Sequence, residues 1–554
     1  MKRRPHPRFV VVAVIAFALL FSTAPRASLS FPTRAAQAGV YNVRTFGAKG
    51  DGRALDTSAI DKTIDAAAAA GGGTVYFPAG NYLSVSIHLK SHIALYLDQG
   101  ATIVAANTSK EAQYDPPEPN QWEAYQDFGH SHWHNSLIWG ENLTNVSILG
   151  PGMIWGKGLV RSGSQSRPQA QNDALNANRA NEAKTPFGYP NPRDAVEPGW
   201  GNKSIALKNC RNVLMRDLTI LHGGHFAILA TGVDNLTIDN LRIDTNRDGI
   251  DVDACKNVRI SNCTVNSPFD DGICPKSSFA LGYARATENV TITNCQVSGY
   301  DEGTLLDGTF KRDFRNANGT FSPTGRIKFG TESNGGFKNI TITNCVFDYC
   351  RGLALESVDG ALLEDVTISN ITMRDISNSP FFLRLGGRRR GPSGPSIGEL
   401  RRIIISNVIV YNAEPRYASI ISGIPGHDIE DVTLNNIRIY YKGGGTKEQA
   451  ALQPPEKETD YPEPTMFGEM PAYGFFIRHV RGLQMSDLSL KLLQADARAP
   501  YIISDAKSID LNHVQMDRAT SAPNFILNEV EDFSLRQSYP LKDLVLPKVK
   551  RQEF

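Results

Sequence analysis

The sequence predicts an all-β protein, a parallel β-helix, and two observations lead to that fold class. A nine-residue unit recurs along the chain: Asn235–Ile243 (NLTIDNLRI) and Asn257–Val265 (NVRISNCTV) align at a spacing of 22 residues. Within each unit apolar and polar residues alternate, as in a strand with one buried face. Because such units bury that face only by stacking on their neighbours, and no helical periodicity separates them, we expect short parallel strands wound into a solenoid.

The N-terminal residues 1–38 have the features of an export signal. A basic start precedes the apolar run Phe9–Phe21, and Ala36-Gln37-Ala38 is a plausible cleavage site. The apolar run is too short to span a bilayer comfortably. We therefore expect a secreted or periplasmic protein whose single β-helical domain covers residues 39–554.

One helix and two long loops should interrupt the strands. The segment Asp56–Ala70 (DTSAIDKTIDAAAAA) reads as an amphipathic helix that ends at three glycines, and it should cover the apolar end of the first coil. Residues 156–200 and 442–473 carry no repeat, so we expect loops beside the coils. Loops of that size can close one end of a cleft.

Composition excludes some partners. The chain has 58 basic and 57 acidic residues, a formal charge of +1, which argues against nucleic-acid binding and against a polybasic membrane anchor. We expect a monomer. Its seven cysteines lie between Cys210 and Cys350, and their places in the repeat favour buried thiols over a disulfide framework, with Cys345 and Cys350 the best candidates for any bridge.

Acidic residues recur at one place of the repeat. Five residues after the unit, four successive coils carry His225, Asp248, Asp270 and Glu302, with Asp271 and Asp301 beside them. Since neighbouring coils lie about 4.8 Å apart, these groups should form a column. Turn residues often have only an architectural role. However, an architectural ladder would favour neutral Asn over anions that repel one another. Such crowding should raise the pKa of one carboxyl, as an acid for glycosidic cleavage requires.

These residues carry a resemblance to a known family. Asn246-Arg247-Asp248, Asp270-Asp271 and Arg326-Ile327-Lys328, in that order on a repeat, together with Tyr41-Asn42-Val43-Arg44 and Phe77-Pro78-Ala79-Gly80, resemble the family 28 glycoside hydrolases, the polygalacturonases and their relatives. The resemblance runs from about Val40 onward. It implies a right-handed, single-stranded parallel β-helix, a pectic polysaccharide or oligogalacturonide substrate, inversion, and no metal or cofactor.

The resemblance also implies residue roles. Asp270 would protonate the leaving glycosidic oxygen, while Asp248 and Asp271 would hold and deprotonate the attacking water. Arg326 and Lys328 would grip a uronate carboxylate on the leaving side of the bond. The expected substrate-binding set is completed by the following residues: Asn246, Arg247, Lys276, His225, Asp301 and Glu302.

Two departures from the family pattern affect the substrate. Arg247 stands where the family usually has Thr, and Tyr300-Asp301-Glu302-Gly303 stands where its Gly-His-Gly is expected. The acidic residues there resemble the rhamnogalacturonan-cleaving branch, whereas the intact Arg326-Ile327-Lys328 favours galacturonate. We rank galacturonan first and rhamnogalacturonan second.

Three other classes are alternatives. A pectate lyase of the same architecture would need Ca²⁺ and a basic residue, and a non-catalytic β-helix could bind pectin without turnover or serve as a structural protein.

The stretch Gly129–Trp139 holds His130, His132 and His134 on one face of an expected strand. Without a nearby fourth ligand we favour a packing or sugar-stacking role there over a metal site.

Overall fold

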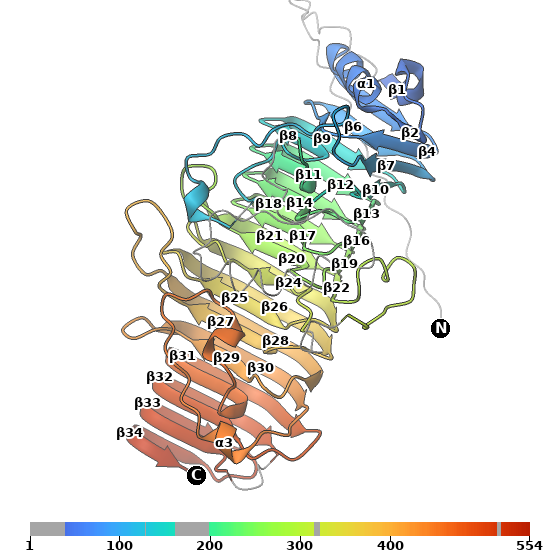
Figure 1. Cartoon of the computed structure of the whole chain (residues 1–554). Helices are drawn as coiled ribbons and strands as arrows, with labels where there is room; N and C mark the ends of the chain where they lie inside the picture. Colours follow the sequence, from blue (N-terminus) through green and yellow to red (C-terminus); the bar gives the residue numbers. More distant parts are fainter. Residues whose placement is uncertain (1–38, 128, 161–198, 315–321, 518–521) are drawn as a thin grey trace, which may run out of the picture. The chain divides into compact units, whose positions relative to one another are not determined.

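The computed structural model describes residues 39–127, 129–160, 199–314, 322–517 and 522–554. The expected export signal and most of the expected loop at 156–200 lie outside this part of the chain. Almost all of the described strands pair in parallel with the strand of the next coil, so the predicted right-handed parallel β-helix is confirmed. Figure 1 shows the stacked coils running from the blue N-terminal end to the red C-terminal end.

The N-terminal coils contribute strands to three ladders. The first ladder comprises β5 (Ile87–His88), β8 (Ile138–Glu141), β11 (Lys203–Lys208), β14 (Phe226–Thr231), β17 (Asp248–Asp253) and β20 (Ile273–Lys276). The second comprises β1 (Gly39–Asn42), β3 (Gly73–Phe77), β6 (Ile93–Leu97), β9 (Thr144–Leu149), β12 (Arg211–Arg216), β15 (Asp234–Asp239), β18 (Lys256–Ser261) and β21 (Thr287–Thr293). The third comprises β2 (Asp51–Leu55), β4 (Gly80–Ser84), β7 (Ala101–Ala105), β10 (Met153–Trp155), β13 (Thr219–Leu221), β16 (Arg242–Asp244), β19 (Thr264–Asn266) and β22 (Gln296–Ser298).

The C-terminal coils continue these ladders with longer strands. The first ladder runs on through β23 (Lys328–Phe329), β25 (Leu353–Ser357), β27 (Phe381–Leu385) and β29 (Ser419–Ser422). The second and third fuse in β24 (Phe337–Asp348), β26 (Leu362–Arg374), β28 (Glu399–Ala413) and β30 (Ile429–Tyr441). The last strands are β31 (Ala472–Leu492), β32 (Ala499–Met516), β33 (Phe525–Arg536) and the antiparallel β34 (Leu544–Glu553).

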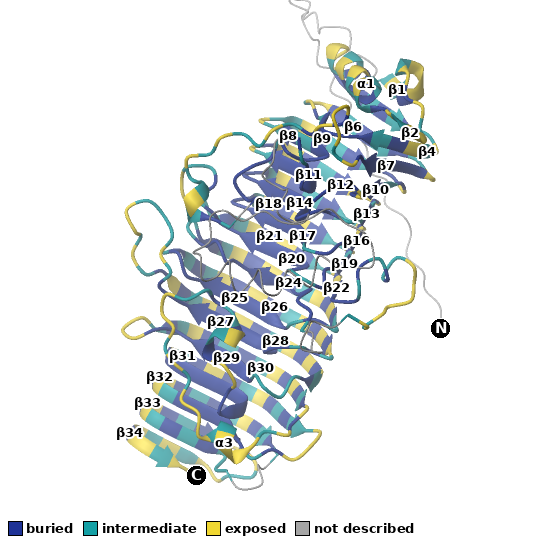
Figure 2. Cartoon of the chain, in the orientation of Figure 1, coloured by how far each residue is buried: buried dark blue, intermediate teal, exposed yellow. Residues whose placement is uncertain are grey.

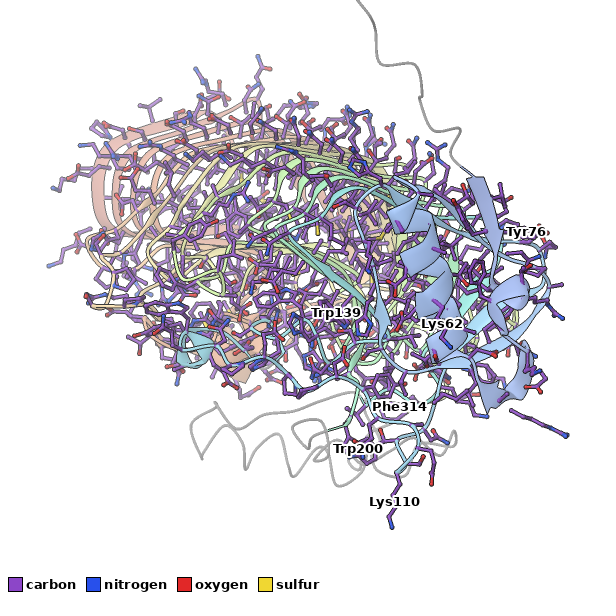
Figure 3. All side chains as sticks on the ribbon, turned by 90° about the horizontal axis from the view of Figure 1, so that it is seen from above. Lys62, Tyr76, Lys110, Trp139, Trp200 and Phe314 are labelled. Carbon is purple, nitrogen blue, oxygen red and sulfur yellow. The ribbon has the colours of Figure 1, made fainter. Side chains whose placement is uncertain are left out.

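A helix lies at the N-terminal end, as the sequence predicts. The helix α1 (Thr57–Ala69) buries Ile60, Ile64 and Ala67 in the core of the solenoid. Its spacing of apolar residues leaves Lys62 on the outer side, and Figure 3 shows α1 beside the first coils. The other described helices are short: α3 (Lys447–Ala450) and the 3-10 turns η1 (Val43–Phe46), η2 (Glu123–Tyr125) and η4 (Pro464–Phe467). In the described part of the chain, no helix has the length and apolarity needed to cross a bilayer.

The core follows the alternation of the sequence. Inward residues such as Ile238, Ile260, Ile292 and Ile342 stack coil upon coil and are fully buried. Figure 2 shows buried residues in dark blue, alternating with more exposed ones along many strands. All seven cysteines are buried free thiols, as the repeat predicts. Cys345 and Cys350 therefore form no bridge.

A column of asparagines connects the coils at the start of each unit. Asn212, Asn235, Asn257, Asn289 and Asn339 all take a left-handed backbone, with φ between 53° and 58°, which Asn tolerates better than most residues. Their side-chain amides bond from coil to coil, for example Asn235 Nδ2 to the Oδ1 of Asn212 at 2.8 Å and Asn257 Nδ2 to the Oδ1 of Asn235 at 3.0 Å. We call this column the asparagine ladder.

Candidate active site

Two neighbouring strands of the first ladder present the acidic residues. In the pairing of β17 with β20, Ile250 lies opposite Ile273, so Asp248 is in register with Asp271 and with Phe226 on the other side. The expectation that Asp248 shares its column with Asp270 and His225 is wrong by one residue. The reason is that the turn from β19 to β20 is longer than the turn from β16 to β17.

The three predicted catalytic aspartates nevertheless come together. One carboxylate oxygen from each of Asp248, Asp270 and Asp271 lies within 4.8 Å of the others. The side chain of Asp270 is 25% exposed, whereas that of Asp271 is 2% exposed and Asp248 as a whole 3%. Asp270 is thus the member that a substrate reaches most easily.

Three cations accompany the three aspartates. Arg247 donates from Nη2 to Oδ2 of Asp270 at 2.5 Å. Arg326 donates from Nε to Oδ1 of Asp271 at 2.9 Å, and Nζ of Lys328 lies 3.2 Å from the other oxygen of Asp271. The cluster is therefore held by pairs of opposite charge even though its members repel one another.

The surroundings separate the pKa values of the aspartates. Burial, then the nearby Asp251 and Asp270, raise the pKa of Asp248 well above its ordinary value, and Oδ1 of Asp248 is buried without a hydrogen-bond partner. Burial alone would also raise the pKa of Asp271, but Lys328 and Arg326 outweigh it and hold that pKa far below its ordinary value. The site thus contains one carboxyl whose raised pKa favours the protonated form and one whose lowered pKa favours the ionised form.

The three oxygens are close enough to share a divalent cation, so we compared their charges with that use. Ca²⁺ or Mg²⁺ needs anionic oxygens with free lone pairs. Here Asp271 is already paired with two cations, Asp270 is paired with Arg247, and the raised pKa of Asp248 favours its neutral form. These residues do not fit a divalent metal well.

A second buried network lies beside the cluster and contains Lys276. Nζ of Lys276 lies 3.6 Å from Asp251 and 3.5 Å from Glu332, and both of those carboxylates also approach Nε2 of His130. Lys276 was expected to bind substrate, but it is 4% exposed and is occupied by these two acids. In the structure its ammonium group lies between the carboxylates of Asp251 and Glu332.

The arginines after β27 complete this network. Arg388 makes a two-point ion pair with Asp359, and Arg390 bonds Asp127 at 2.7 Å and Glu332 at 2.9 Å. These contacts hold the segment around Asp127 against the coils. The network was not expected from the sequence, because Asp251, Glu332 and Asp127 come from three distant segments.

The remaining predicted residues lie around the cluster, each with its own contacts. The backbone carbonyl of Asn246 accepts from Phe269, and His225 packs its ring against Phe226. Asp301 accepts from the backbone amides of Asp313 and Phe314, and Glu302 contacts Nδ1 of His222 at 2.5 Å. Asp301 and Glu302 are not members of the close group, so the expected four-coil acidic column is wrong beyond Asp271.

Arg326 and Lys328 lie in the coil that follows Asp270 and Asp271. Ile327 pairs directly with Ile273, so Arg326-Ile327-Lys328 occupies the coil next to the aspartates. The segment Tyr300–Gly303 belongs to the same coil but precedes the long insertion that leads to β23. Cations therefore occupy the place beside the acidic pair.

The segment between β30 and β31 adds residues that the sequence did not predict. Glu463 pairs with Nη2 of Arg326 and, at 3.1 Å, with Arg351, and the Tyr461 ring lies 5.6 Å from Nζ of Lys328. Glu356, on β25 in the next coil, lies 3.7 Å from Lys328. Burial raises the pKa of Glu356 to about 8. No motif signals Glu463, because it lies in an insertion without repeat.

The three histidines of the 129–139 stretch point to different acids. His130 approaches Asp251 and Glu332, His132 lies 3.4 Å from Glu123, and His134 contacts Glu141 at 3.1 Å and stacks on Trp139. They lie in a loop, so the expected strand begins later, at Ile138. Among the described residues they form no common ligand set.

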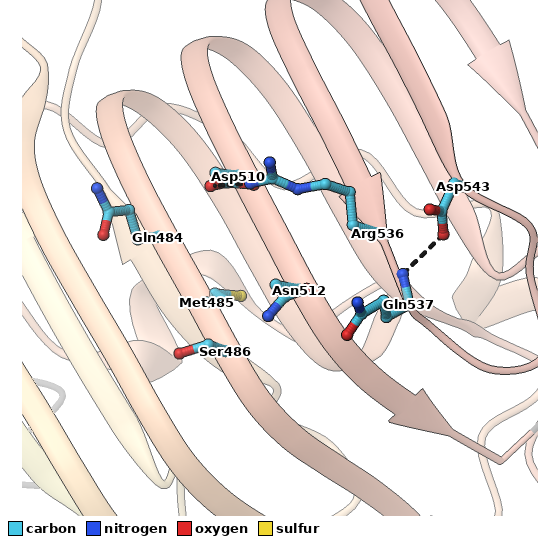
Figure 4. Close-up of a pocket in the computed structure, with 8 residues that line it drawn as sticks. All are labelled: Gln484, Met485, Ser486, Asp510, Asn512, Arg536, Gln537 and Asp543. Atoms are coloured by element: carbon cyan, nitrogen blue, oxygen red, sulfur yellow. Dashed lines mark hydrogen bonds and ion pairs between the residues drawn. The ribbon is translucent and has the colours of Figure 1, made fainter.

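A pocket at the C-terminal coils is separate from this site. It is lined by residues of β31 to β33 and the turn that follows, and Figure 4 shows Asp510, Asn512 and Arg536 in it. Asp510 is paired with Arg536 at 2.6 Å. The pocket lies on the second ladder, whereas the aspartates lie on the first, so it has no part in their chemistry.

Comparison with known proteins agrees with the geometry. Residues 40–228 match the family described as rhamnogalacturonase A/epimerase, pectate lyase-like, and residues 194–318 match the right-handed β-helix region. A probable polygalacturonase from Vitis vinifera is 25% identical over 305 residues, 51% of this chain and 56% of that protein. The exo-poly-alpha-D-galacturonosidase of Dickeya chrysanthemi is 28% identical over 258 residues, 42% of this chain and 40% of that protein.

The matches therefore span about half the length of these curated relatives. Among solved structures, the family 28 exopolygalacturonase of Yersinia enterocolitica superposes with a TM-score of 0.61 at 19% identity, covering 85% of this chain and 78% of that one, which supports the fold. The repeat and the sequence relatives support the predicted resemblance to the family 28 glycoside hydrolases.

Proposed function

We propose that the protein hydrolyses the glycosidic bond of α-linked galacturonic acid in pectic polysaccharide. The observation that carries the proposal is the group of three aspartates within 4.8 Å, one held ionised by Arg326 and Lys328 and one with a raised pKa. Glycosidic cleavage needs this combination of a protonated and an ionised carboxyl. The polygalacturonase relatives suggest the pectic substrate.

The acid step involves Asp248 and Asp270. These two carboxyl groups share one proton. In the free enzyme it resides on Asp248, because burial raises the pKa of Asp248. Asp270 is the more exposed of the two and faces the substrate, so it delivers the proton to the leaving oxygen after receiving one from Asp248. Arg247, at 2.5 Å, orients the Asp270 carboxylate for this transfer.

The base step involves Asp271 and the Asp248 carboxylate that remains. They hold a water on the opposite face of the sugar, and one of them takes its proton as the water oxygen bonds the anomeric carbon and the glycosidic bond breaks. One proton leaves the cluster and one returns, so the enzyme is restored. The ionised state of Asp271, maintained by Lys328 and Arg326, suits it to accept that proton.

Inversion is proposed from the family resemblance. Inverting enzymes typically separate their two carboxyls by roughly 6.5–9.5 Å, and retaining enzymes by roughly 5–5.5 Å. One oxygen of each aspartate lies within 4.8 Å of the others, closer than the inverting range, so inversion is supported by the family resemblance and not by this separation. Proton NMR of the first product anomer decides between the two outcomes: the β-anomer supports inversion and the α-anomer contradicts it.

The test of the proposed activity is product analysis on polygalacturonate and rhamnogalacturonan. We expect saturated oligosaccharides or monosaccharides with new reducing ends. Activity should persist with a chelator, because Asp270 and Asp271 are already paired with cations. Unsaturated products and loss of activity with the chelator would indicate a lyase, and binding without turnover would indicate a non-catalytic pectin-binding protein.

A second candidate function has its own support. The family matched by residues 40–228 includes rhamnogalacturonase A, and Tyr300-Asp301-Glu302-Gly303 departs from the polygalacturonase pattern. A rhamnogalacturonan hydrolase would use the same aspartates. Product analysis on polygalacturonate and rhamnogalacturonan compares the two substrates directly.

We further propose that the protein acts outside the cytoplasm, which detection of the mature protein in culture medium or periplasm would test.

A further inference from the structure

The two cations expected to grip a uronate carboxylate are enclosed and paired. Arg326 is 1% exposed and Lys328 is 2% exposed. Arg326 contacts Asp271 at 2.9 Å through Nε and Glu463 through Nη2, while Lys328 lies 3.2 Å from Asp271 and 3.7 Å from Glu356. A carboxylate that occupies the guanidinium of Arg326 is thus already present, and it belongs to the protein.

Glu463 is held in place by its local sequence. It stands between Pro462 and Pro464, and a residue before proline is restricted to extended backbone. Glu463 has φ −139° and ψ 146°, within that region, and the turn η4 begins directly after it. The Pro-Glu-Pro sequence therefore presents the carboxylate with little conformational freedom to lose.

The segment around Glu463 is anchored on the outer face of the first ladder. Phe467 and Met470 are buried in an apolar cluster with Ala354, Phe382 and Ile420. Upstream, the guanidinium groups of two buried arginines donate to its backbone carbonyls: Arg384 to Glu456 and Lys457, and Arg478 to Pro454 and Pro455. These contacts fix the segment at both ends of the stretch that carries Glu463.

The two carboxylates already on Arg326, from Asp271 and Glu463, disfavour a third. Burial alone would raise the pKa of Glu463, but Arg326 and Arg351 outweigh it and lower that pKa, so Glu463 is ionised. A uronate beside Arg326 would face Glu463 and Asp271, two anions whose cations are already engaged. A sugar without a carboxylate meets no such repulsion.

We infer that Glu463 is a specificity-determining residue that excludes a uronate from the Arg326 side of the scissile bond and admits a neutral sugar there. The inference rests on the proposed function and names its substrate class: a galacturonide joined to an uncharged sugar. Glu463 achieves this by taking the position that a substrate carboxylate would otherwise occupy on Arg326.

Two defined hexasaccharides test the inference on the natural chain. One contains only α-linked galacturonate, and the other alternates galacturonate with rhamnose. Chromatography of the products gives kcat/KM for each bond. We expect the bond from galacturonate to rhamnose to be cut at least about tenfold faster than a bond between two galacturonates, and equal rates or the reverse preference would overturn the inference.

The variant Glu463→Gln tests the residue itself, with Glu458→Ala as the matched control. Glu458 is exposed on the same segment, so its loss should change neither rate. Glu463→Gln should raise kcat/KM on the all-galacturonate substrate at least about tenfold while leaving the alternating substrate within about twofold. An unchanged ratio in a variant with a natural circular dichroism spectrum would overturn the inference.

Failure of the proposed activity is distinguishable from failure of this inference. If the natural chain cuts neither hexasaccharide, the proposed hydrolysis is wrong. Calorimetric binding of the two hexasaccharides then still decides about Glu463: tighter binding of the alternating one supports its role, and equal or tighter binding of the all-galacturonate one contradicts it. The same comparison applies if Glu463→Gln does not fold.

Discussion

The asparagine ladder and the aspartate cluster are both built from polar side chains that meet across neighbouring coils, yet they satisfy their charges differently. In the asparagine ladder each amide bonds to the next within the same column, as Asn257 does to Asn235 at 3.0 Å. In the cluster, three carboxyl groups meet, and two of them, Asp270 and Asp271, depend on cations from other coils. The first arrangement stabilises the coils by itself, whereas the second is tolerated only with support, which is typical of a functional site.

The largest expected effect comes from removing the charge of Asp271, which is paired with Arg326 and Lys328. Asp271→Asn should lower kcat at least about a thousandfold, because the base is lost. It should also lower the free energy of unfolding by about 3–5 kcal/mol, because Arg326 and Lys328 lose the carboxylate they share. Urea titration and steady-state kinetics measure the two effects. Asp510→Asn, which breaks an exposed pair with Arg536, is the control and should cost about 1 kcal/mol or less.

The next largest effect concerns Arg247, the cation that contacts the proposed acid Asp270. Arg247→Thr introduces the residue that the family usually has and removes the 2.5 Å contact to Asp270. We expect kcat/KM to fall about tenfold to a hundredfold with the fold intact, because the acid loses its orientation. The exposed Arg259 on β18 supplies the control variant Arg259→Thr, which should retain the natural rate. Equal rates for both variants would show that Arg247 has no part in the reaction.

A pH dependence of stability should arise beside the cluster. Burial raises the pKa of Glu356 to about 8 from an ordinary value of 4.5, so the folded state binds its proton more tightly than the unfolded state does. The stability it contributes is fully present below pH 4.5 and is lost as the pH rises toward 8. Replacing it in Glu356→Gln should flatten the fall in unfolding free energy across this window, measured by urea titration at successive pH values. A fall of unchanged steepness would contradict the assignment.

The smallest expected effect is in the asparagine ladder. Asn257→Ala removes one bond between coils and places alanine at φ 57°, so we expect a loss of about 1 kcal/mol in unfolding free energy. The kcat should stay at the natural value, because the ladder is separate from the aspartates. A large fall in kcat with this variant would erase the distinction between the two columns.

The sequence predicted the coils, the N-terminal helix and the three aspartates because these depend on local pattern. The recurring unit from Asn235 to Ile243 sets strand spacing, and alternation sets which side is buried. The register error at Asp270 arose because one additional turn residue shifts a whole strand, which a count from the preceding unit does not reveal.

The partners of the cluster could not be predicted in the same way. Glu463 lies 137 residues from Arg326 in the sequence, in an insertion without repeat, and Asp127 lies 263 residues from Arg390. Such contacts depend on where a loop is anchored on the coils. Arg388 and Arg390 follow two glycines in the sequence, with no sign there of the buried acids that the structure pairs them with.

The most direct test of the account is the release of reducing ends from polygalacturonate and rhamnogalacturonan by the natural chain and by Asp270→Asn, side by side. We predict hydrolysis of pectic substrate by the natural chain and a loss of at least about a thousandfold in the variant, with the same melting temperature. A rate for Asp270→Asn close to that of the natural chain would show that the aspartate cluster does not carry out the reaction.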